Sequence, residues 1–244
     1  MYKKDLPFVG NRNTENIEGY AMGSWFGYKF SHVDPTNGHL MAYAQRRNET
    51  DAIIGTELID LSAISETDLQ LKYSTFYLGT QTPSTYGGFN TRLHYKNVDF
   101  TANFMLGSGN KLLGFMDRRE GPSGETDDVT AGRTNRLQDQ QYRWRQPGDQ
   151  TDIPVYQNKV ANYNRYILDT DLENANYIRC TELGFMYRIS PEKLQNSIFS
   201  QVKFGLFTNN LFTLTSYSGS DPEAKLTFGY PLTRSYNFSV SVNF

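Results

Sequence analysis

The sequence contains little cysteine, no long apolar run and no excess of charge of either sign. Cys180 is the single cysteine, which excludes a disulfide framework and a metal site built from several cysteines. No stretch reaches the roughly 18 apolar residues that a membrane-spanning helix needs. The 24 Lys and Arg residues are balanced by 26 Asp and Glu residues, so we expect no basic surface for nucleic acid.

Aromatic residues, in contrast, are abundant: 35 of the 244 residues are Phe, Tyr or Trp. Apolar residues, counted with Gly and without Tyr, make up about 39% of the chain, below the roughly 45–50% of ordinary soluble domains. A disordered chain would lack the aromatic residues. The composition therefore indicates a folded protein whose apolar residues are not arranged as in a typical soluble core.

The clearest pattern is an alternation of apolar and polar residues with a period of two, which is typical of β-strands. Lys96-Asn97 separates two alternating segments and predicts a two-residue hairpin turn. The only helix-like stretch is short, from Pro191 to Gln195. The pattern predicts an all-β protein with seven strands, at 18–30, 38–46, 86–95, 98–108, 175–189, 198–211 and 232–244.

The connections between these expected strands alternate between short and long. Their lengths are about 7, 39, 2, 66, 8 and 20 residues. Successive connections of antiparallel strands lie at opposite ends, so all the short ones fall on one rim. Outer-membrane barrels show this asymmetry, with short turns on the periplasmic side and long loops outside. The strands, several of them 10 to 15 residues long, are also long enough to cross the membrane.

An antiparallel transmembrane β-barrel would give the two faces of each strand different surroundings, with the apolar face against lipid and the polar face towards a watery lumen. A soluble antiparallel sheet with one solvated face would also alternate, so alternation alone leaves both alternatives open. Strand length and the sorting of the connections favour the barrel. The residues expected to face the lumen include Asn90, Arg92, His94, Asp99, Asn103, Glu182, Arg188 and Lys203.

The sequence carries no motif for catalysis. Ser108 lies between two glycines, but this spacing does not match a nucleophile elbow. The three histidines lack metal-ligand spacing, and the acidic residues at 169–173 fit either a calcium site or, more simply, a solvated loop. We therefore expect no enzyme activity, no cofactor and no metal.

The long connection at 109–174 is polar and contains several aromatic side chains. Such groups on an outward loop suit the capture of a sugar or a peptide, and the alternative is that they pin the loop to the protein's own surface. The candidates for ligand contact are Tyr142, Trp144, Tyr156, Tyr163 and Tyr166.

Several motifs, in order along nearly the whole chain, resemble the C-terminal part of SusC/RagA-type TonB-dependent outer-membrane transporters. The stretches that carry the resemblance are EGYAMGSWFGYKFSHVDPTNG (18–38), LGTQTPSTYGGFNTRLHYKNVDF (78–100), RWRQPGDQTDIP (143–154), NYIRCTELGFMYRIS (176–190), NNLFTLTSYSGSDPE (209–223) and GYPLTRSYNFSVSVNF (229–244). Each motif alone is weak, whereas the ordered set is specific.

The resemblance implies a fold and a function. The family has a signal peptide, a TonB-contacting segment, a plug domain and a barrel of about 22 strands, and seven strands cannot close a barrel of that width. We therefore expect residues 1–244 to be a single incomplete domain, the C-terminal portion of the barrel, with the plug domain absent. The implied function is import of oligomeric glycans or peptides across the bacterial outer membrane. The alternative is a secreted soluble β-rich glycan-binding module.

The same resemblance implies partners. They are a SusD-like surface lipoprotein, the TonB complex acting through N-terminal regions that this chain lacks, the barrel assembly machinery and the lipid of the outer membrane. An apolar stripe ends at the terminal aromatic residue, and the resemblance implies that the assembly machinery recognises it. This expected assembly signal consists of Tyr236, Phe238, Val240, Val242 and Phe244.

Overall fold

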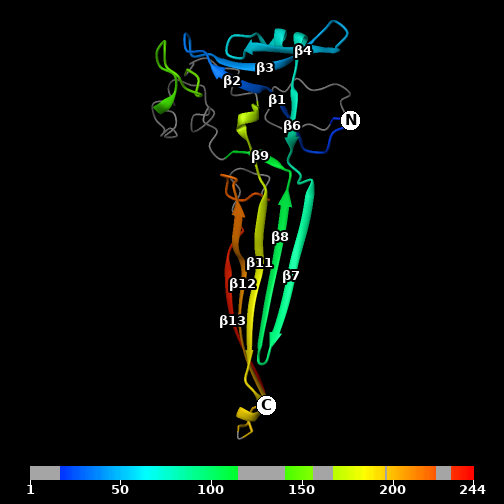
Figure 1. The fold of residues 1–244 in the computed structure, drawn as a ribbon, viewed down its shortest axis with the longest axis vertical. Coiled ribbons are helices and arrows are strands. Elements are labelled where there is room, and N and C mark those ends of the chain that lie inside the picture. The colour runs from blue at the N-terminus through cyan, green and yellow to red at the C-terminus, as the bar shows by residue number, and fades with distance from the viewer. Residues whose placement is uncertain (1–16, 115–140, 156–166, 196, 224–231) are drawn as a thin grey trace. The chain divides into compact units, whose positions relative to one another are not determined.

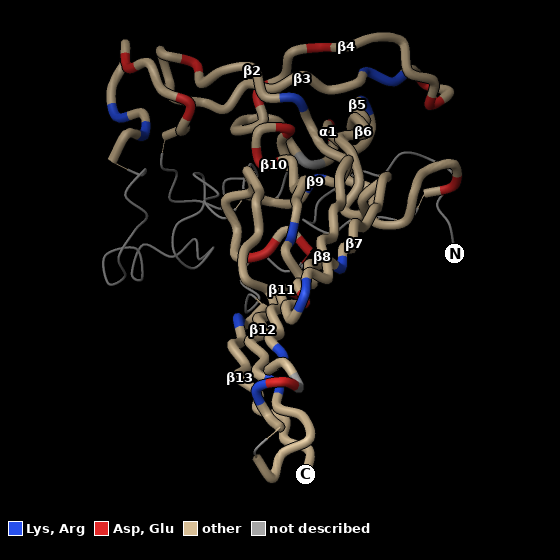
Figure 2. The backbone as a smooth tube through the Cα atoms, turned by 60° about the horizontal axis from the view of Figure 1, so that its bottom comes forward, with Lys and Arg blue, Asp and Glu red and all other residues tan. Residues whose placement is uncertain are grey.

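The computed structural model describes residues 17–114, 141–155, 167–195, 197–223 and 232–244, and within these ranges the protein is all-β with one short α-helix (Figure 1). It forms two compact units. The first contains residues up to Thr82 together with Lys111–Glu173, and the second contains Pro83–Asn110 and Asn174–Phe244. Figure 2 shows Lys, Arg, Asp and Glu interspersed along the backbone.

The second unit is a five-stranded antiparallel sheet in the order β13-β12-β11-β8-β7. Its strands are long, which confirms the expectation from the alternating pattern. They are β7 (Thr85–Tyr95), β8 (Val98–Ser108), β11 (Tyr177–Arg188), β12 (Gln201–Thr215) and β13 (Ser235–Asn243).

The short connections of this sheet lie at one end, as predicted. The Lys96-Asn97 turn joins β7 to β8, and Arg188 N, at the end of β11, donates to Asn97 O at 2.8 Å. Ser200 N, just before β12, donates to Asn243 O at 2.8 Å, so the C-terminus lies at the same end. The connections β8–β11 and β12–β13 therefore leave from the opposite end. Pro191–Lys193 forms a single 3-10 turn where the sequence suggested a helix.

The first unit consists of small sheets. One contains β2 (Lys29–Val33), β3 (Leu40–Arg47) and β4 (Ile53–Asp60), with β5 (Tyr73–Ser74) also paired to β3. In the others β1 (Ser24–Gly27) pairs with β6 (Phe76–Thr80), and β9 (Lys111–Leu113) pairs with β10 (Leu172–Asn174). Asp169–Asp171 is a 3-10 turn before β10.

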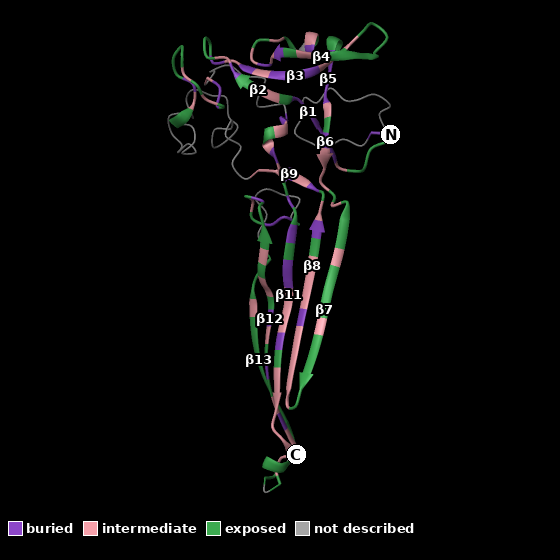
Figure 3. Ribbon diagram, viewed as in Figure 1, coloured by how far each residue is buried: buried purple, intermediate pink, exposed green. Residues whose placement is uncertain are grey.

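This unit has a conventional buried core, and buried residues follow β1 and β3 (Figure 3). One cluster packs the inner face of β3 against the helix α1 (Glu66–Lys72) and the segment around Leu168, with Leu40, Ala42, Leu61 and Leu69 fully buried. A second cluster contains Trp25, Leu78, Ile167 and Leu172. Apolar burial of this kind, at about 25 cal/mol per Å², is the main stabilising contribution to such a unit.

The prediction that 18–30 and 38–46 extend the same wall as the later strands is wrong. The first range is divided into β1 and β2, because Tyr28 forms a bridge with Leu168 and Phe30 N donates to Asp169 Oδ1 at 2.8 Å. All four residues of β1 are buried, so neither of its faces is available to lipid. The second range forms β3, whose alanines lie in the core of the first unit.

The expected 39-residue connection at 47–85 is also wrong, because this range contains β4, α1, β5 and β6. The helix begins with Ser65, whose hydroxyl accepts from Asp68 N at 3.1 Å, and Lys72 pairs with Asp68 at 2.8 Å. A Ser followed three residues later by an acidic residue is a helix-start signal that could have located it.

Candidate functional site

The register of the five-stranded sheet places the expected lumen-facing residues on one face. Residues directly opposite each other on neighbouring strands point to the same side. Asn90, Asn103 and Glu182 form one such row, and His94 and Asp99 form another. Arg92 lies on the same face, between these two rows. Arg188 lies on this face beyond the second row, with Lys203 opposite it on β12. That this face lines a lumen stays a prediction.

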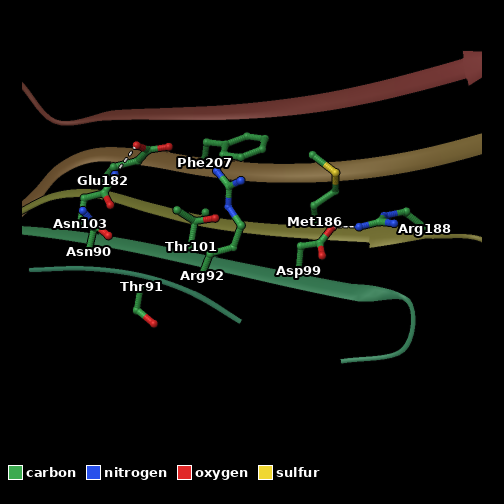
Figure 4. Close-up of a pocket in the computed structure, with 11 residues that line it drawn as sticks. Asn90, Thr91, Arg92, Asp99, Thr101, Asn103, Glu182, Met186, Arg188 and Phe207 are labelled. Atoms are coloured by element: carbon green, nitrogen blue, oxygen red, sulfur yellow. Dashed lines mark hydrogen bonds and ion pairs between the residues drawn. The ribbon is translucent and has the colours of Figure 1, made fainter. Parts of the chain in front are cut away.

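Polar contacts connect the side chains of this face. His94 Nδ1 lies 2.6 Å from Asp99 Oδ1, and Arg188 pairs with the other oxygen of the same carboxylate. Asn103 Nδ2 donates to Glu182 Oε2 at 2.8 Å. Figure 4 shows the Asp99–Arg188 pair and the Asn103–Glu182 pair at the two ends of a hollow, with Arg92 between them. The face therefore offers charges of both signs and amide groups, which suits contact with water and polar solutes.

The hollow measures about 580 Å³ and contains one aromatic ring, Phe207. This ring lies against two glycines of the same face, since a Cβ on Gly184 or Gly205 would come within 2.9 Å or 2.6 Å of it. Met186 lines the hollow beside it. The polar face therefore has one flat apolar area between its charged groups. Sequence reasoning missed Phe207, although its place in the alternation of β12, two residues before Asn209 and four after Lys203, was a signal that it lies on the polar face.

The opposite face of the sheet is apolar and exposed. Phe89, Phe104 and Phe212 form a row across it, with ring centroids 6.4 Å apart in both pairs. Phe89 is 61% exposed and Phe238 is 71% exposed, and Figure 3 shows their strands, β7 and β13, exposed along most of their length. Four of the expected assembly residues lie on this face of β13, namely Tyr236, Phe238, Val240 and Val242. Phe244 follows the strand and packs against Phe199, with ring centroids 5.5 Å apart. Recognition by an assembly machinery stays a prediction.

The aromatic candidates of the long connection have different surroundings. Tyr142 is 65% exposed, whereas Trp144 is 8% exposed. The Trp144 indole donates to Pro35 O at 3.1 Å, and its ring lies so close to Gly38 that a Cβ there would come within 2.6 Å. Packing on this turn favours the pinning alternative for Trp144. Tyr156, Tyr163 and Tyr166 lie outside the described residues, so their ligand role stays a prediction.

The structure also brings together residues that sequence reasoning did not connect. Arg179 of β11 pairs with Asp221 and Glu223 of the β12–β13 connection, 42 and 44 positions later. Two bulges lie between Arg179 and these acidic residues. Thr181 of β11 is an extra residue relative to β8. Asn210, with φ of 51°, lies in an irregular part of β12. Each bulge shifts the alternation by one position.

The described residues contain no cluster of three or more His, Cys, Asp or Glu placed to hold a metal ion. Two of the acidic residues considered for calcium bind the backbone instead: Asp169 accepts from Phe30 N, and Asp171 Oδ2 accepts from Leu168 N at 2.7 Å. In the part of the chain that the structure describes, no helix is long and apolar enough to cross a membrane.

Comparison with curated proteins finds relatives of one kind. The chain is 27% identical over 249 aligned residues to TonB-dependent receptor P3 of Formosa agariphila, covering 93% of this chain and 22% of that protein. It is 25% identical over 138 residues to TonB-dependent receptor P39 of the same organism, covering 56% of this chain and 13% of the relative. The chain thus spans about a fifth of the length of the first of these relatives. No protein-family model matches it.

Solved structures show the same likeness at the level of the fold. The chain matches a structure of the RagAB peptide transporter with a TM-score of 0.70 and 20% identity, over 100% of this chain and 25% of that one. It matches the RagAB peptide importer in its "open-open" state with a TM-score of 0.70 and 22% identity, over 100% and 24% of the two chains. Sequence and fold thus both resemble the C-terminal part of a TonB-dependent transporter of the SusC/RagA type, as the motifs of the sequence predict.

Proposed function

We propose that this chain forms part of the wall of a TonB-dependent transporter in the bacterial outer membrane. The observation that carries the proposal is the five-stranded sheet with one exposed apolar face and one polar face. Strands of 9 to 15 residues suit a membrane that needs about 9 to 11 tilted residues per strand. The curated relatives named as TonB-dependent receptors support the same assignment.

The apolar face argues against the alternative of a soluble glycan-binding module. Contiguous exposed apolar patches of more than a few hundred Å² are rare on soluble proteins. Here the apolar residues extend over all five strands, from Phe89 on β7 to Val242 on β13. In lipid this arrangement is favourable, and the aromatic row formed by Phe89, Phe104 and Phe212 would lie at an interface, as aromatic girdles do.

Further strands are needed to complete the proposed wall. Within the described ranges, no strand pairs with the outer edge of β7 or of β13. Unpaired backbone groups in lipid cost several kcal/mol each, and barrels avoid them by closing. We propose that residues 1–244 are the C-terminal portion of a wider barrel of about 22 strands, as in transporters of this size.

The proposed cargo is an oligomeric peptide or glycan, and the protein itself is not an enzyme. The matched structure with the same fold is that of a peptide transporter, which supports a peptide as the first choice. A SusD-like surface lipoprotein is the proposed partner, as the resemblance to SusC/RagA-type transporters implies. A TonB complex, the barrel assembly machinery and outer-membrane lipid complete the proposed set of partners, and nucleic acid is not among them.

Cell fractionation of the bacterium that carries the gene tests the location. We expect the protein in the outer-membrane fraction, where it resists washing with alkaline carbonate and is released by detergent. A soluble periplasmic protein and a resident outer-membrane protein serve as controls in the same fractions. Recovery in the soluble periplasm or the medium without detergent would contradict the membrane wall and favour the soluble module.

Uptake measurements test the cargo. Cells with the gene and cells without it receive fluorescently labelled oligopeptides and, separately, oligosaccharides of matched size. We expect loss of peptide uptake in the deletion strain and in a strain that lacks TonB. Loss of oligosaccharide uptake alone would identify a glycan as the cargo, and unchanged uptake of both would contradict a role in import.

A further inference from the structure

Arg179 is a buried cation on the polar face of the sheet. It lies on β11 opposite Met105 of β8 and Thr213 of β12. Its side chain is 3% exposed, whereas Arg188, on the same face near the other end of β11, is 40% exposed. The charge of Arg179 is therefore covered by something that does not cover Arg188.

The cover is the β12–β13 connection. Arg179 Nη2 donates to Asp221 Oδ1 at 2.7 Å, and Nη1 pairs with Glu223. Arg179 Nε also donates to Thr213 Oγ1 at 3.1 Å. Asp221 is itself 7% exposed. One guanidinium thus pairs with two carboxylates of the same short segment. It donates a charge-assisted hydrogen bond to Asp221, and its contact with Glu223 is an ion pair without hydrogen-bond geometry.

Tyr177 extends this anchor by one row towards the end of the sheet. Its hydroxyl donates to Glu223 Oε1 at 2.8 Å. Its ring lies flat on β8, where a Cβ on Gly107 would come within 2.6 Å of it. Within the segment, Glu223 N donates to Asp221 Oδ1 at 2.8 Å, so the two carboxylates are held relative to each other. Tyr217 at the start of the segment is 7% exposed.

We infer that Arg179 is a positioning residue that holds the segment 216–223 folded over the polar face of the sheet. The consequence for transport rests on the proposed function. If the polar face lines a passage, this segment narrows the passage at the end where the long connections lie. The segment is then a fixed part of the wall that limits the width of the solutes that pass. A surface loop free in solvent would leave Arg179 exposed and would not need two acids paired with one arginine.

Cysteine labelling of the protein purified in detergent tests the anchor. In a Cys180→Ser background, Tyr217→Cys places a single thiol in the covered segment, and a bulky water-soluble maleimide reports its accessibility. Arg179→Gln should raise the labelling rate by about tenfold, because charge-assisted bonds shift the equilibrium between held and released segment by at least that factor. Arg188→Gln is the matched control, since it removes another arginine of the same strand and face, and it should change the rate less than about twofold.

A second variant removes the same bonds from the other side. Asp221→Asn combined with Glu223→Gln leaves every strand of the sheet unchanged and should release the segment as Arg179→Gln does. Slow labelling in both variants would overturn the inference, as would fast labelling of the Tyr217→Cys protein in which Arg179, Asp221 and Glu223 are all unchanged. If Arg179→Gln does not fold, seen as loss of heat-modifiable migration, the labelling rate of the Asp221→Asn/Glu223→Gln variant tests the inference instead.

Uptake in cells tests the consequence. With the segment released, longer or branched oligomers should enter more readily relative to short linear ones, measured as a ratio within each strain. An unchanged ratio in a variant with a released segment would overturn the narrowing of the passage. If the protein is not in the outer membrane, the proposed function fails, whereas the labelling result still decides whether Arg179 holds the segment.

Discussion

The ring of Phe207 lies against Gly184 of the neighbouring strand, where a Cβ would come within 2.9 Å of Phe207 Cδ1. A valine at Gly184 would have to displace this ring, and overpacking of this kind costs about 1–3 kcal/mol. We expect Gly184→Val to lower the melting temperature of the purified protein in detergent. Gly88→Ala is the matched control on the same face, because its Cβ would meet only Phe104 O at 3.4 Å, an ordinary contact. Combining Gly184→Val with Phe207→Ala should recover part of the loss, and a double variant as unstable as the sum of both changes would argue against the ring contact.

Leu93 and His94 are neighbours on β7 that point to opposite faces of the sheet. An arginine at Leu93 would enter lipid, at a cost of about 2–4 kcal/mol near the midplane of the membrane. An arginine at His94 would remain on the polar face and could still donate to Asp99. We therefore expect Leu93→Arg to reduce the amount of folded protein in the outer membrane, measured by heat-modifiable migration, and His94→Arg to have little effect. Equal effects at both positions would contradict the assignment of the apolar face to lipid and of the polar face to water.

Trp144 and Tyr142 separate a packing role from a ligand role in the long connection. Trp144→Ala removes the ring that covers Gly38 and the bond to Pro35 O, and burial of this size corresponds to a loss of about 3–5 kcal/mol. We expect faster hydrogen exchange in 34–38 for Trp144→Ala, a smaller change for Trp144→Phe, and none for the exposed Tyr142→Ala. A loss of cargo uptake in Tyr142→Ala without any change in exchange would support ligand contact at Tyr142. Unchanged exchange in Trp144→Ala would show that the indole does not hold the turn.

The hairpin and the C-terminal strand could be read from the sequence because each has a regular alternation and a clear boundary. Lys96-Asn97 interrupts two alternating segments, and the structure forms β7 and β8 within one residue of the predicted ends. β13 alternates without interruption to the end of the chain, so its two faces could be assigned directly.

Much of the first unit could not be read in the same way, because several of its strands are not covered on one face only. β1 is buried on both faces, and most of β4 is exposed, so neither shows a period of two. The irregularity between β1 and β2 depends on Leu168 and Asp169, about 140 positions later, and local pattern carries no information on such contacts. The same holds for Arg179 and Asp221, whose pairing follows from the fold of a connection rather than from any motif.

Phe244 has one observed contact and one proposed role, which a pair of variants can separate. Its ring packs against Phe199, with centroids 5.5 Å apart, and the residue is 83% exposed. Deletion of Phe244 removes both the ring contact and the end of the apolar stripe, which as an edge strand offers backbone bonds and side chains to a docking partner. Phe199→Ala removes the ring contact alone. If the stripe is an assembly signal, deletion of Phe244 in the protein as the bacterium makes it should abolish its insertion and cause accumulation in the periplasm, whereas Phe199→Ala should insert normally with a slightly lower melting temperature. Quantitative blotting of the two fractions measures the difference, and equally mild effects of the two changes would leave Phe244 with a packing role only.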